Sequence, residues 1–271
     1  MAAGGGAERF RELHHGERPL LLPNPWDRGS AKLLESLGFE ALASTSSGFA
    51  ATLGRMDGMV SRDEALAHAA ELVDAVDVPV SADLENCFAD DPDGVAETVR
   101  LAIEAGLAGC SIEDFSGRES DTIYEPGLAA ERVAAAAEAA HSGERGLVLT
   151  ARAENHVHGR DDLADTIARL QSFQEAGADV LFAPGVRDLG QIRELIASVD
   201  LPLNVLALPG MPTVSELGEA GVSRISVGGG FAFTAYGAAV TAGRELLESG
   251  TYGFWETGAV GGKAAHDAFS A

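Results

Sequence analysis

Short apolar segments alternate with amphipathic segments along the chain, and this alternation constrains the fold more than any other feature of the sequence. Eight segments have the character of strands, because each is short and bounded by Gly, Pro or Asp: residues 19–23, 41–45, 79–83, 109–113, 146–151, 179–183, 201–206 and 224–227. Strands that alternate with helices form a parallel sheet with crossover helices. The sequence therefore predicts an α/β protein.

The segments between the strands carry the periodicity and the end signals of helices. Apolar residues recur at three and four positions in residues 61–76, 92–105, 128–140, 161–176 and 188–199. Gly38, Gly106, Gly177 and Gly221 each follow a helical stretch and precede a strand, as C-cap glycines do. Eight such units in about 250 residues favour a (β/α)8 TIM barrel over an open sheet, and no GxGxxG motif follows the first strand.

The chain is expected to form one domain over residues 1–271, because it lacks a Pro-, Gly- or charge-rich linker that would divide it. Residues 1–17 are predicted to be a flexible N-terminal segment. After the eighth unit, residues 233–249 are expected to be a helix and residues 251–271 a C-terminal helical extension. This extension carries Tyr252, Phe254 and Trp255, so we expect it to cover apolar surface, with a neighbouring subunit as a candidate.

The charge balance argues against two classes of partner. The chain has 19 Lys and Arg residues against 42 Asp and Glu residues, a formal net charge of −23. Nucleic acid is held mainly by Lys and Arg, and an acidic membrane surface would be repelled for the same reason. The sequence also lacks an apolar run of the ~18 residues that span a membrane, and its N-terminus lacks a signal-peptide pattern. We therefore expect a cytoplasmic protein.

Carboxylates follow the third and fourth predicted strands, at the end of a barrel where catalytic groups lie. Asp83 and Glu85 lie in SADLEN at the end of the third strand, Glu113 lies in SIEDF at the end of the fourth, and the fifth strand ends in TARAEN with Arg152. Neighbouring carboxylates repel one another unless a cation lies among them, and oxygen ligands favour Mg²⁺, with Mn²⁺ as the alternative. The competing interpretation is that these charges cap helices or bind neighbouring loops. Only two cysteines are present, without CxxC spacing, which argues against structural zinc.

Six stretches together resemble the isocitrate lyase and phosphoenolpyruvate mutase superfamily, in its phosphoenolpyruvate-mutase-like branch. They run in matching order from about residue 20 to residue 210 and are LLPNPWDRGSAKLLESLGFEALASTSSGFAATLGRMDG, VPVSADLENCF, AGCSIED, LTARAEN, EAGADVLFAPG and PLNVLALPG. The resemblance implies a (β/α)8 barrel whose last helix exchanges with a neighbour in a homo-oligomer, usually a tetramer. It also implies one Mg²⁺ site and a small carboxylic acid substrate that reacts through an enolpyruvate-like species.

The resemblance further implies a role for each of four carboxylates. Asp83 matches the acidic residue that contacts the metal. Glu85, Glu113 and Asp57 match the residues that hold the waters of the metal. The second position of the DxD-like element is Glu85 and not Asp, which lengthens one ligand arm.

A second set of residues matches the substrate-binding positions of the superfamily. Thr45, Ser46 and Ser47 match a loop after the second strand whose N–H groups and hydroxyl receive the substrate carboxylate. Arg152 matches the arginine that reaches the developing negative charge. Asn204 is a weaker match to a polar residue at the end of the seventh strand.

The segment after the fourth strand departs from the lyase relatives. Isocitrate and methylisocitrate lyases carry KKCGH or KRCGH there, whereas this chain has FSGRESDTIYEPG, without a cysteine. We expect residues 115–127 to form a lid, and proton transfer must then come from another group. The candidates are Glu119, Asp121, Tyr124 and His156. Tyr124 is preferred because a phenol can donate a proton without first carrying a charge into a closed site.

These inferences predict a Mg²⁺-dependent lyase that cleaves a carbon–carbon bond of a small 2-oxo or 2-hydroxy carboxylic acid through an enolpyruvate-type intermediate. Carbon–phosphorus chemistry of the mutase or phosphonopyruvate hydrolase kind is the second hypothesis, and a barrel that binds a carboxylate without turnover is the third. Three features stay open at this point. Cys87 is either a reactive thiol or a packed residue, His156 and His158 face either the pocket or solvent, and the glycine run 228–230 is either a phosphate turn or a packing site.

Overall fold

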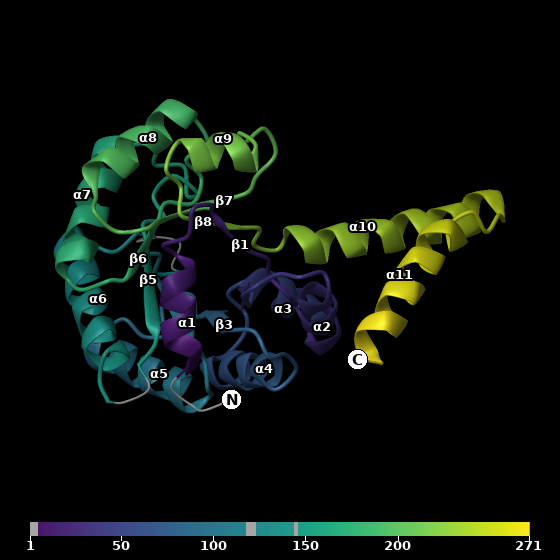
Figure 1. Ribbon diagram of the computed structural model, residues 1–271, viewed down its shortest axis with the longest axis horizontal. Coiled ribbons are helices and arrows are strands. Elements are labelled where there is room, and N and C mark those ends of the chain that lie inside the picture. Colours follow the sequence, from purple (N-terminus) through teal and green to yellow (C-terminus); the bar gives the residue numbers. More distant parts are fainter. Residues whose placement is uncertain (1–4, 118–122, 144–145, 271) are drawn as a thin grey trace.

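The computed structural model describes residues 5–117, 123–143 and 146–270. Its eight parallel strands form one sheet in the order β1-β8-β7-β6-β5-β4-β3-β2, which curls into a nearly closed barrel (Figure 1). The ends of the sheet meet where the Ala43 N–H donates to the Pro23 carbonyl at 3.1 Å. The predicted (β/α)8 fold is confirmed. The strands are β1 Leu20–Leu22, β2 Leu42–Ala43, β3 Val80–Asp83, β4 Gly109–Glu113, β5 Val148–Arg152, β6 Val180–Phe182, β7 Leu203–Leu206 and β8 Arg224–Ser226.

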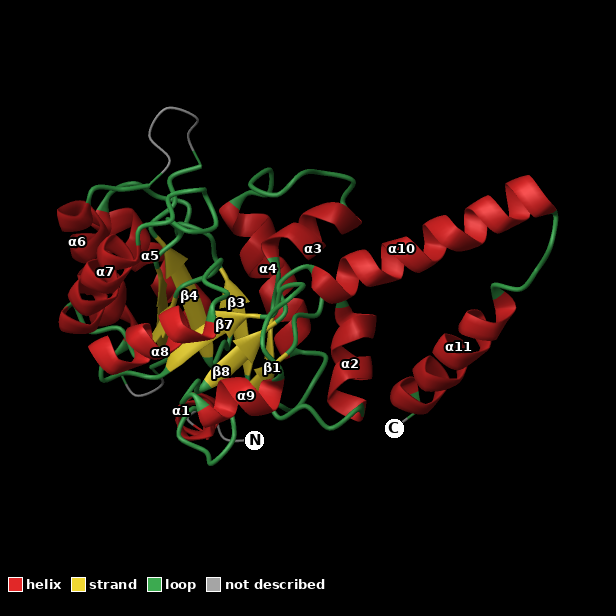
Figure 2. Ribbon diagram, turned by 90° about the horizontal axis from the view of Figure 1, so that it is seen from above, coloured by secondary structure: helices red, strands yellow, loops and turns green. Residues whose placement is uncertain are grey.

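Helices lie outside the strands and alternate with them in the chain (Figure 2). Side-chain caps explain several of their starts: Ser61, Asp91 and Asp188 each accept a hydrogen bond from a backbone N–H in the first turn. Gly106 and Gly177 have φ angles of 85° and 100°, as helix-ending glycines should. These helices are α2 Arg28–Ser36, α3 Ser46–Thr52, α4 Arg62–Val73, α5 Pro92–Glu104, α6 Pro126–Ala140, α7 Leu163–Glu175, α8 Leu189–Ser198 and α9 Val214–Glu219.

The main apolar core lies between the sheet and the helices, and a smaller apolar cluster that includes Phe10 and Leu20 fills the amino-terminal end of the barrel, whereas the cavity above it carries polar side chains. Leu72, Val99 and Phe173, each from a helix, belong to the main core and are almost fully buried. Small polar side chains occupy inward positions of the strands instead of the bulky residues that usually fill such barrels: Ser81, Ser111, Thr150, Asn204 and Ser226. The barrel interior is therefore available for binding a polar ligand.

The N-terminal segment is not the flexible tail that the sequence predicted. Residues Gly5–Leu13 form helix α1, and the ring of Phe10 is fully buried. A Cβ atom on Gly109, at the start of β4, would lie 2.7 Å from that ring, so α1 packs directly against the amino-terminal end of the barrel. The prediction failed because the glycine-rich start hides a short amphipathic face that only the barrel can bury.

The C-terminal part forms an arm that leaves the barrel. Helix α10, Gly230–Arg244, runs outward into a π-helical turn at Glu245–Ser249, and α11, Trp255–Phe269, returns beside α2 (Figure 1). A helical extension was predicted and is present. Its exchange between subunits stays a prediction. None of the described helices combines the length and the apolar character needed to cross a membrane.

Candidate active site

A cavity of about 180 Å³ begins at the carboxyl ends of the strands and reaches down into the barrel. Its upper wall includes Asp83 and Arg152, and its lower wall includes Ser226 and Arg224. A wider cleft of about 850 Å³ flanks α1 and β1 and is not lined by the predicted site residues. We therefore place the candidate active site in the smaller cavity, where the predicted carboxylates meet.

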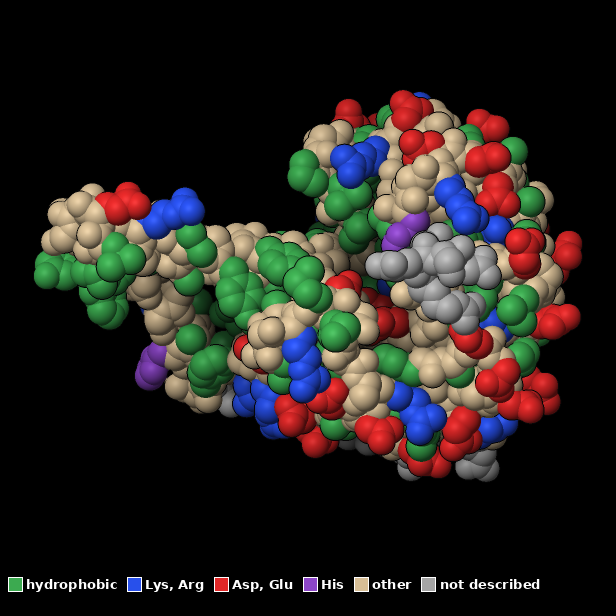
Figure 3. Space-filling view, turned by 180° about the vertical axis from the view of Figure 1, so that it is seen from behind, with side chains coloured by type: hydrophobic (Ala, Val, Ile, Leu, Met, Phe, Trp, Pro, Cys, Tyr) green, Lys and Arg blue, Asp and Glu red, His purple; other side chains and the backbone are tan. Residues whose placement is uncertain are grey.

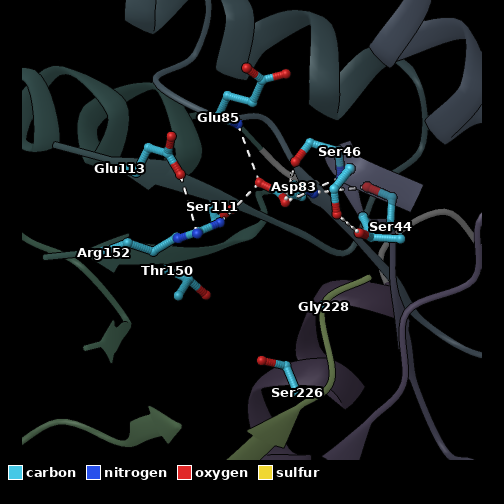
Figure 4. Close-up of polar contacts among 12 residues, drawn as sticks. Ser44, Ser46, Asp83, Glu85, Ser111, Glu113, Thr150, Arg152, Ser226 and Gly228 are labelled. Atoms are coloured by element: carbon cyan, nitrogen blue, oxygen red, sulfur yellow. Dashed lines mark hydrogen bonds and ion pairs between the residues drawn. The ribbon is translucent and has the colours of Figure 1, made fainter. Parts of the chain in front are cut away.

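Arg152 lies at the centre of the site and joins three carboxylates (Figure 4). Its guanidinium lies 3.1 Å from Asp83 Oδ1, 3.3 Å from Glu113 Oε2 and 2.7 Å from Glu154 Oε1. Burial alone would lower the pKa of Arg152, but the three carboxylates outweigh it and raise the pKa. Arg152 therefore stays a cation held in one position, as the sequence-based role requires.

Asp83 is held by groups from two other segments. The Ser46 N–H and hydroxyl donate to Asp83 Oδ2 at 3.3 and 3.1 Å, and the Asp83 N–H donates to Ser44 Oγ at 2.9 Å. Ser46 was predicted to lie in a loop, but it lies in the first turn of α3. Thr45 caps this helix by accepting from the Gly48 N–H, and its hydroxyl also lies 3.2 Å from Ser47 Oγ. The three predicted residues are thus together and line the cavity.

The other predicted metal-site carboxylates surround Asp83 with raised pKa values. Loss of solvent and the charges of Asp83 and Asp57 raise the pKa of Glu85 to about 7. Burial raises the pKa of Glu113 well above its ordinary value, against the influence of Arg152. Loss of solvent also raises the pKa of Asp57, a rise opposed by a hydrogen bond from Ser46. In Figure 4 the Glu85 carboxylate points away from Arg152.

The carboxylate cluster does not form a ready metal cage. Within the described part of the chain, no three His, Cys, Asp or Glu side chains are arranged to hold a metal ion directly. Asp83 and Glu113 instead contact Arg152. A metal held here would contact few protein oxygens directly and keep several of its waters, as Mg²⁺ commonly does.

The segment after β3 is strained, and a buried arginine holds it. Glu85, Cys87 and Phe88 have φ angles of 50°, 58° and 56°, an uncommon conformation for residues other than glycine. Arg132 of α6 is 1% exposed and donates to the Asn86 carbonyl at 2.5 Å and to the Ala89 carbonyl at 2.9 Å. Arg132 thus holds the backbone of the segment that carries Glu85.

Tyr124, the preferred proton donor, lies outside the cavity wall. It is 4% exposed, and its ring lies under the guanidinium of Arg132 at 4.0 Å. Its hydroxyl donates to Asp90 and accepts from the Asn86 amide at 3.1 Å. These contacts place Tyr124 beside the strained segment, and its role in proton transfer stays a prediction.

His156, another proton-transfer candidate and one that the structure describes, does not line the cavity either. Its side chain is buried, and its Nδ1 is 3.6 Å from Asp161 Oδ1. His158 stacks on Phe115 at 3.8 Å between ring centroids. Glu119 and Asp121 lie outside the described residues, as does much of the predicted lid. The bridge between Phe115 and Ile123 marks the base of that segment.

Two open alternatives are decided by packing. Cys87 is fully buried, and burial raises the pKa of its thiol to about 12, which favours the packed residue over the reactive thiol. The N–H of Gly228 donates to Asn24 Oδ1 at 2.9 Å. A Cβ on Gly229 would lie 2.6 Å from the ring of Phe233 and 2.7 Å from Ser47 Oγ. The glycine run therefore serves close packing beside the site.

Sequence reasoning did not identify two buried arginines near the site, Arg132 and Arg224. Arg224 lies inside a predicted strand, and a charged residue at an inward position of a barrel strand was the available signal. Arg132 lies on a helix, where an arginine normally faces solvent, so the sequence around it gave no sign that it would be buried. Asn204, which was predicted as a substrate-binding residue, is fully buried and lines the cavity. It accepts a hydrogen bond from Arg224 and donates one to Ser226.

The fold and the site together define a (β/α)8 barrel with an acidic and arginine-containing site at the carboxyl ends of its strands. The family model described as phosphoenolpyruvate phosphomutase matches residues 10–247. The chain belongs to this family, within the isocitrate lyase and phosphoenolpyruvate mutase superfamily.

Similar proteins agree with this assignment. A crystal structure from Burkholderia cenocepacia J2315, provisionally described as a lyase/mutase, is 47% identical with a TM-score of 0.96, and the match covers 99% of this chain and 98% of that one. An uncharacterized Mycobacterium tuberculosis protein, MT2054, is 34% identical over 221 residues, which are 81% of each chain. The 2-methylisocitrate lyase of Escherichia coli K12 is 29% identical over 82% of this chain and 78% of its own. Oxaloacetate acetylhydrolase in complex with oxalate is 25% identical with a TM-score of 0.82, covering 92% of this chain and 89% of that one.

Proposed function

We propose that the chain is a Mg²⁺-dependent lyase that cleaves a carbon–carbon bond of a small 2-oxo or 2-hydroxy carboxylic acid through an enolpyruvate-type intermediate. The observation that carries the proposal is the position of Arg152, fixed by Asp83, Glu113 and Glu154 at the top of a small polar cavity. A positive charge fixed in this way stabilises negative charge that develops on a substrate without having to reorganise first. The cavity volume of about 180 Å³ limits the substrate to a small molecule.

The donor set fits a hydrated Mg²⁺ ion. Asp83 would contact the ion, and Glu85, Glu113 and Asp57 would hold its waters. The raised pKa values of Glu85 and Asp57 reflect crowded carboxylates, and a cation relieves such crowding. When bound, Mg²⁺ supplies positive charge that polarises substrate oxygens. Mn²⁺ has similar ligand preferences and is the alternative ion.

The side chains of the protein orient the substrate and stabilise its charge. Ser46 holds Asp83 through its N–H and hydroxyl, and Ser47, beside it at the start of α3, lies on the cavity wall where its hydroxyl and N–H would meet the substrate carboxylate. Arg152 faces the same space and would stabilise the enolate left after a bond at C3 breaks. The proton donor stays unassigned, because neither Tyr124 nor His156 lines the cavity.

Carbon–phosphorus chemistry is a second candidate, and one observation favours it. The family model that matches this chain is itself described as a phosphoenolpyruvate phosphomutase. A phosphonate, like a carboxylate, would present negative oxygens to Arg152. A carboxylate-binding barrel without turnover is the third candidate, and it would bind oxalate with Mg²⁺ but release no product.

One screen tests the three candidates together. The protein is incubated with Mg²⁺ and a series of 2-oxo and 2-hydroxy diacids, with phosphonopyruvate in parallel, and pyruvate, phosphate and phosphoenolpyruvate are measured. Pyruvate release from a diacid supports the lyase, whereas conversion of phosphonopyruvate alone supports the second candidate. Oxalate should inhibit competitively. Binding of oxalate with Mg²⁺ but no turnover of any compound would contradict both enzymatic proposals.

A variant pair ties the activity to the described site. Arg152→Gln should lower kcat/KM by about 100-fold or more, as removal of one preorganised charge-stabilising donor does. The matched control Arg193→Gln changes an exposed arginine of α8 and should leave kcat/KM unchanged. Equal activity of the two variants would exclude Arg152 from the reaction.

A further inference from the structure

A second arginine, Arg224, crosses the barrel interior below the candidate active site. It is the first residue of β8 and is only 4% exposed. Its Nε–H donates to Asn204 Oδ1 at 3.0 Å, and its Nη2–H donates to Thr150 Oγ1 of β5 at 3.1 Å. Its Nη1 lies 3.0 Å from Nε2 of His14, which follows helix α1. The guanidinium thus forms part of the cavity floor, above α1.

The partners of Arg224 are neutral. The Nδ1 of His14 lies 2.7 Å from the Phe10 carbonyl and so carries the proton, which leaves Nε2 as an acceptor for Arg224. Burial and the charge of Arg224 lower the pKa of His14 to about 3, so this ring stays neutral. Among the described residues, Arg224 forms no ion pair, whereas Arg152 forms three. A buried cation without a carboxylate partner is costly unless an anion reaches it.

Arg224 still has donors for such an anion. A guanidinium has five N–H groups, and three are used in its hydrogen bonds to Asn204, Thr150 and His14 within the described structure. One N–H on each terminal nitrogen is left. Arg224 lines the cavity together with Asn204 and the hydroxyl-bearing Ser226. In Figure 4, Thr150 and Ser226 mark this lower level, on the side of Arg152 away from Glu85.

The depth of the floor sets the length of a ligand that would reach it. Thr150, which contacts Arg224, and Arg152 both lie on β5, two residues apart. Two residues of strand span about 7 Å. A diacid with four or five carbons in all has three or four carbon–carbon bonds and a carbon–oxygen bond at each end, so its outermost oxygens lie roughly 6–7 Å apart when it is extended, which matches this distance.

We propose that Arg224, with Asn204 and Ser226, forms an anion subsite at the floor of the cavity that takes the distal carboxylate of a short dicarboxylic substrate. The subsite rests on the proposed function, because the other end of the substrate would be held by Arg152, by Ser47 and by the Mg²⁺ ion proposed at Asp83. It makes the protein selective for diacids over monocarboxylic acids of equal length.

Matched ligand pairs test the subsite. Dissociation constants are measured by calorimetry with Mg²⁺ present for malate against 2-hydroxybutyrate and for 2-oxoglutarate against 2-oxovalerate, where a methyl group replaces the distal carboxylate. The wild-type protein should bind at least one diacid about 30-fold more tightly than its partner, the scale of a buried charged contact. In Arg224→Gln the ratio should fall to about one, while oxalate, which is too short to reach the floor, should bind within about threefold of wild type.

Two further variants separate the subsite from a structural role. Arg224→Lys keeps a positive charge and should retain part of the preference for the diacid, which gives a result even where Arg224→Gln fails to fold. His14→Gln changes the partner of Arg224 below the floor and should lower stability but leave the diacid preference in place. Loss of the preference in His14→Gln with Arg224→Lys unchanged from wild type would overturn the assignment to Arg224.

The outcomes for the subsite and for the proposed function differ. If wild-type protein binds oxalate with Mg²⁺ but shows no preference for either diacid, the subsite is wrong and the proposed function stands. The subsite is also wrong if a folded Arg224→Gln keeps the preference. If oxalate does not bind wild-type protein with Mg²⁺ present, the proposed function is contradicted, whatever the ratio of the pairs.

Discussion

Helices α6 and α10 have the same length of 15 residues but differ in how much of their surface is buried. Helix α6 buries seven of its residues against the barrel, including Arg132, whereas α10 buries only Ala232. The exposed side chains of α10 include Phe233, Tyr236 and Val240, and apolar side chains run along the arm in Figure 3. The apolar surface of α6 is covered within the barrel, whereas much of the apolar surface of α10 is exposed.

From this difference we expect chemistry and assembly to belong to separate regions. The carboxylates, Arg152 and Arg224 are all held by strands and helices of the barrel. The arm presents the kind of apolar surface that marks a protein interface, and we expect a second copy of the chain to cover it in a homo-oligomer. Changes in the barrel should therefore alter activity without altering assembly, and changes in the arm should do the reverse.

The largest effect is expected from Asp83→Ala. This substitution removes the carboxylate that accepts from Ser46 and pairs with Arg152, and Mg²⁺-dependent turnover should fall by about 1000-fold, as loss of a central electrostatic group does. Calorimetry should show no Mg²⁺ binding, and the particle mass in solution should stay that of wild type. Unchanged Mg²⁺ affinity in a folded variant would remove Asp83 from the metal site.

The second prediction concerns the exposed apolar surface of the arm. Val240 is 51% exposed on α10, and Val240→Asp would place a charge in the expected interface. The dissociation constant of the oligomer, measured by analytical ultracentrifugation, should rise by about 100-fold. The matched control Leu128→Asp adds the same charge at an exposed apolar position of α6 and should leave the assembly intact. A monomeric wild-type protein would contradict the expected interface.

The third prediction concerns acid stability and the barrel floor. The folded-state pKa of His14 is about 3, below the ordinary value of 6.5, because of burial and then the charge of Arg224. Between pH 6.5 and pH 3, His14 is therefore protonated in the unfolded chain but neutral in the folded protein. The contribution of His14 to the free energy of unfolding is complete above pH 6.5 and declines as the pH falls towards 3. The slope should approach about 1.4 kcal/mol per pH unit.

Urea unfolding of wild type and His14→Gln between pH 4 and pH 8 measures this slope by difference. Glu85 acts in the opposite direction, because its pKa is raised to about 7 and its contribution to stability falls as the pH rises through that value. Both proteins retain Glu85, so its influence cancels in the comparison. Parallel curves for the two proteins would show that His14 is protonated in the folded barrel.

The smallest effect is expected from Tyr124→Phe. The substitution removes the hydroxyl that donates to Asp90 and accepts from Asn86, and stability should fall by about 1 kcal/mol, the scale of a typical net hydrogen bond. Since Tyr124 does not line the cavity, kcat should change by less than about threefold. A loss of kcat of about 100-fold or more would restore Tyr124 as the proton donor.

Much of the barrel could be predicted because its signals are local. Each strand is a short segment between turn residues, and several helices, such as α5 and α7, have a capping residue, an apolar period and a glycine after the end, so all eight strands were placed from sequence. Asp83, Glu113 and Arg152 come together because parallel strands present their carboxyl ends at one edge of the barrel. Strand order and periodicity therefore placed these charges correctly without knowledge of any contact.

What the sequence by itself determined is the repeated unit, the closed barrel and the charged residues at its upper edge, since these follow from spacing along the chain. Only the tertiary structure decided what lies beneath that edge. The burial of Phe10, the path of Arg224 to Thr150, and the place of Tyr124 beside Arg132 depend on contacts between residues far apart in the chain. The role of a side chain depends on which cavity it reaches, and no local pattern in the sequence indicates which cavity that is.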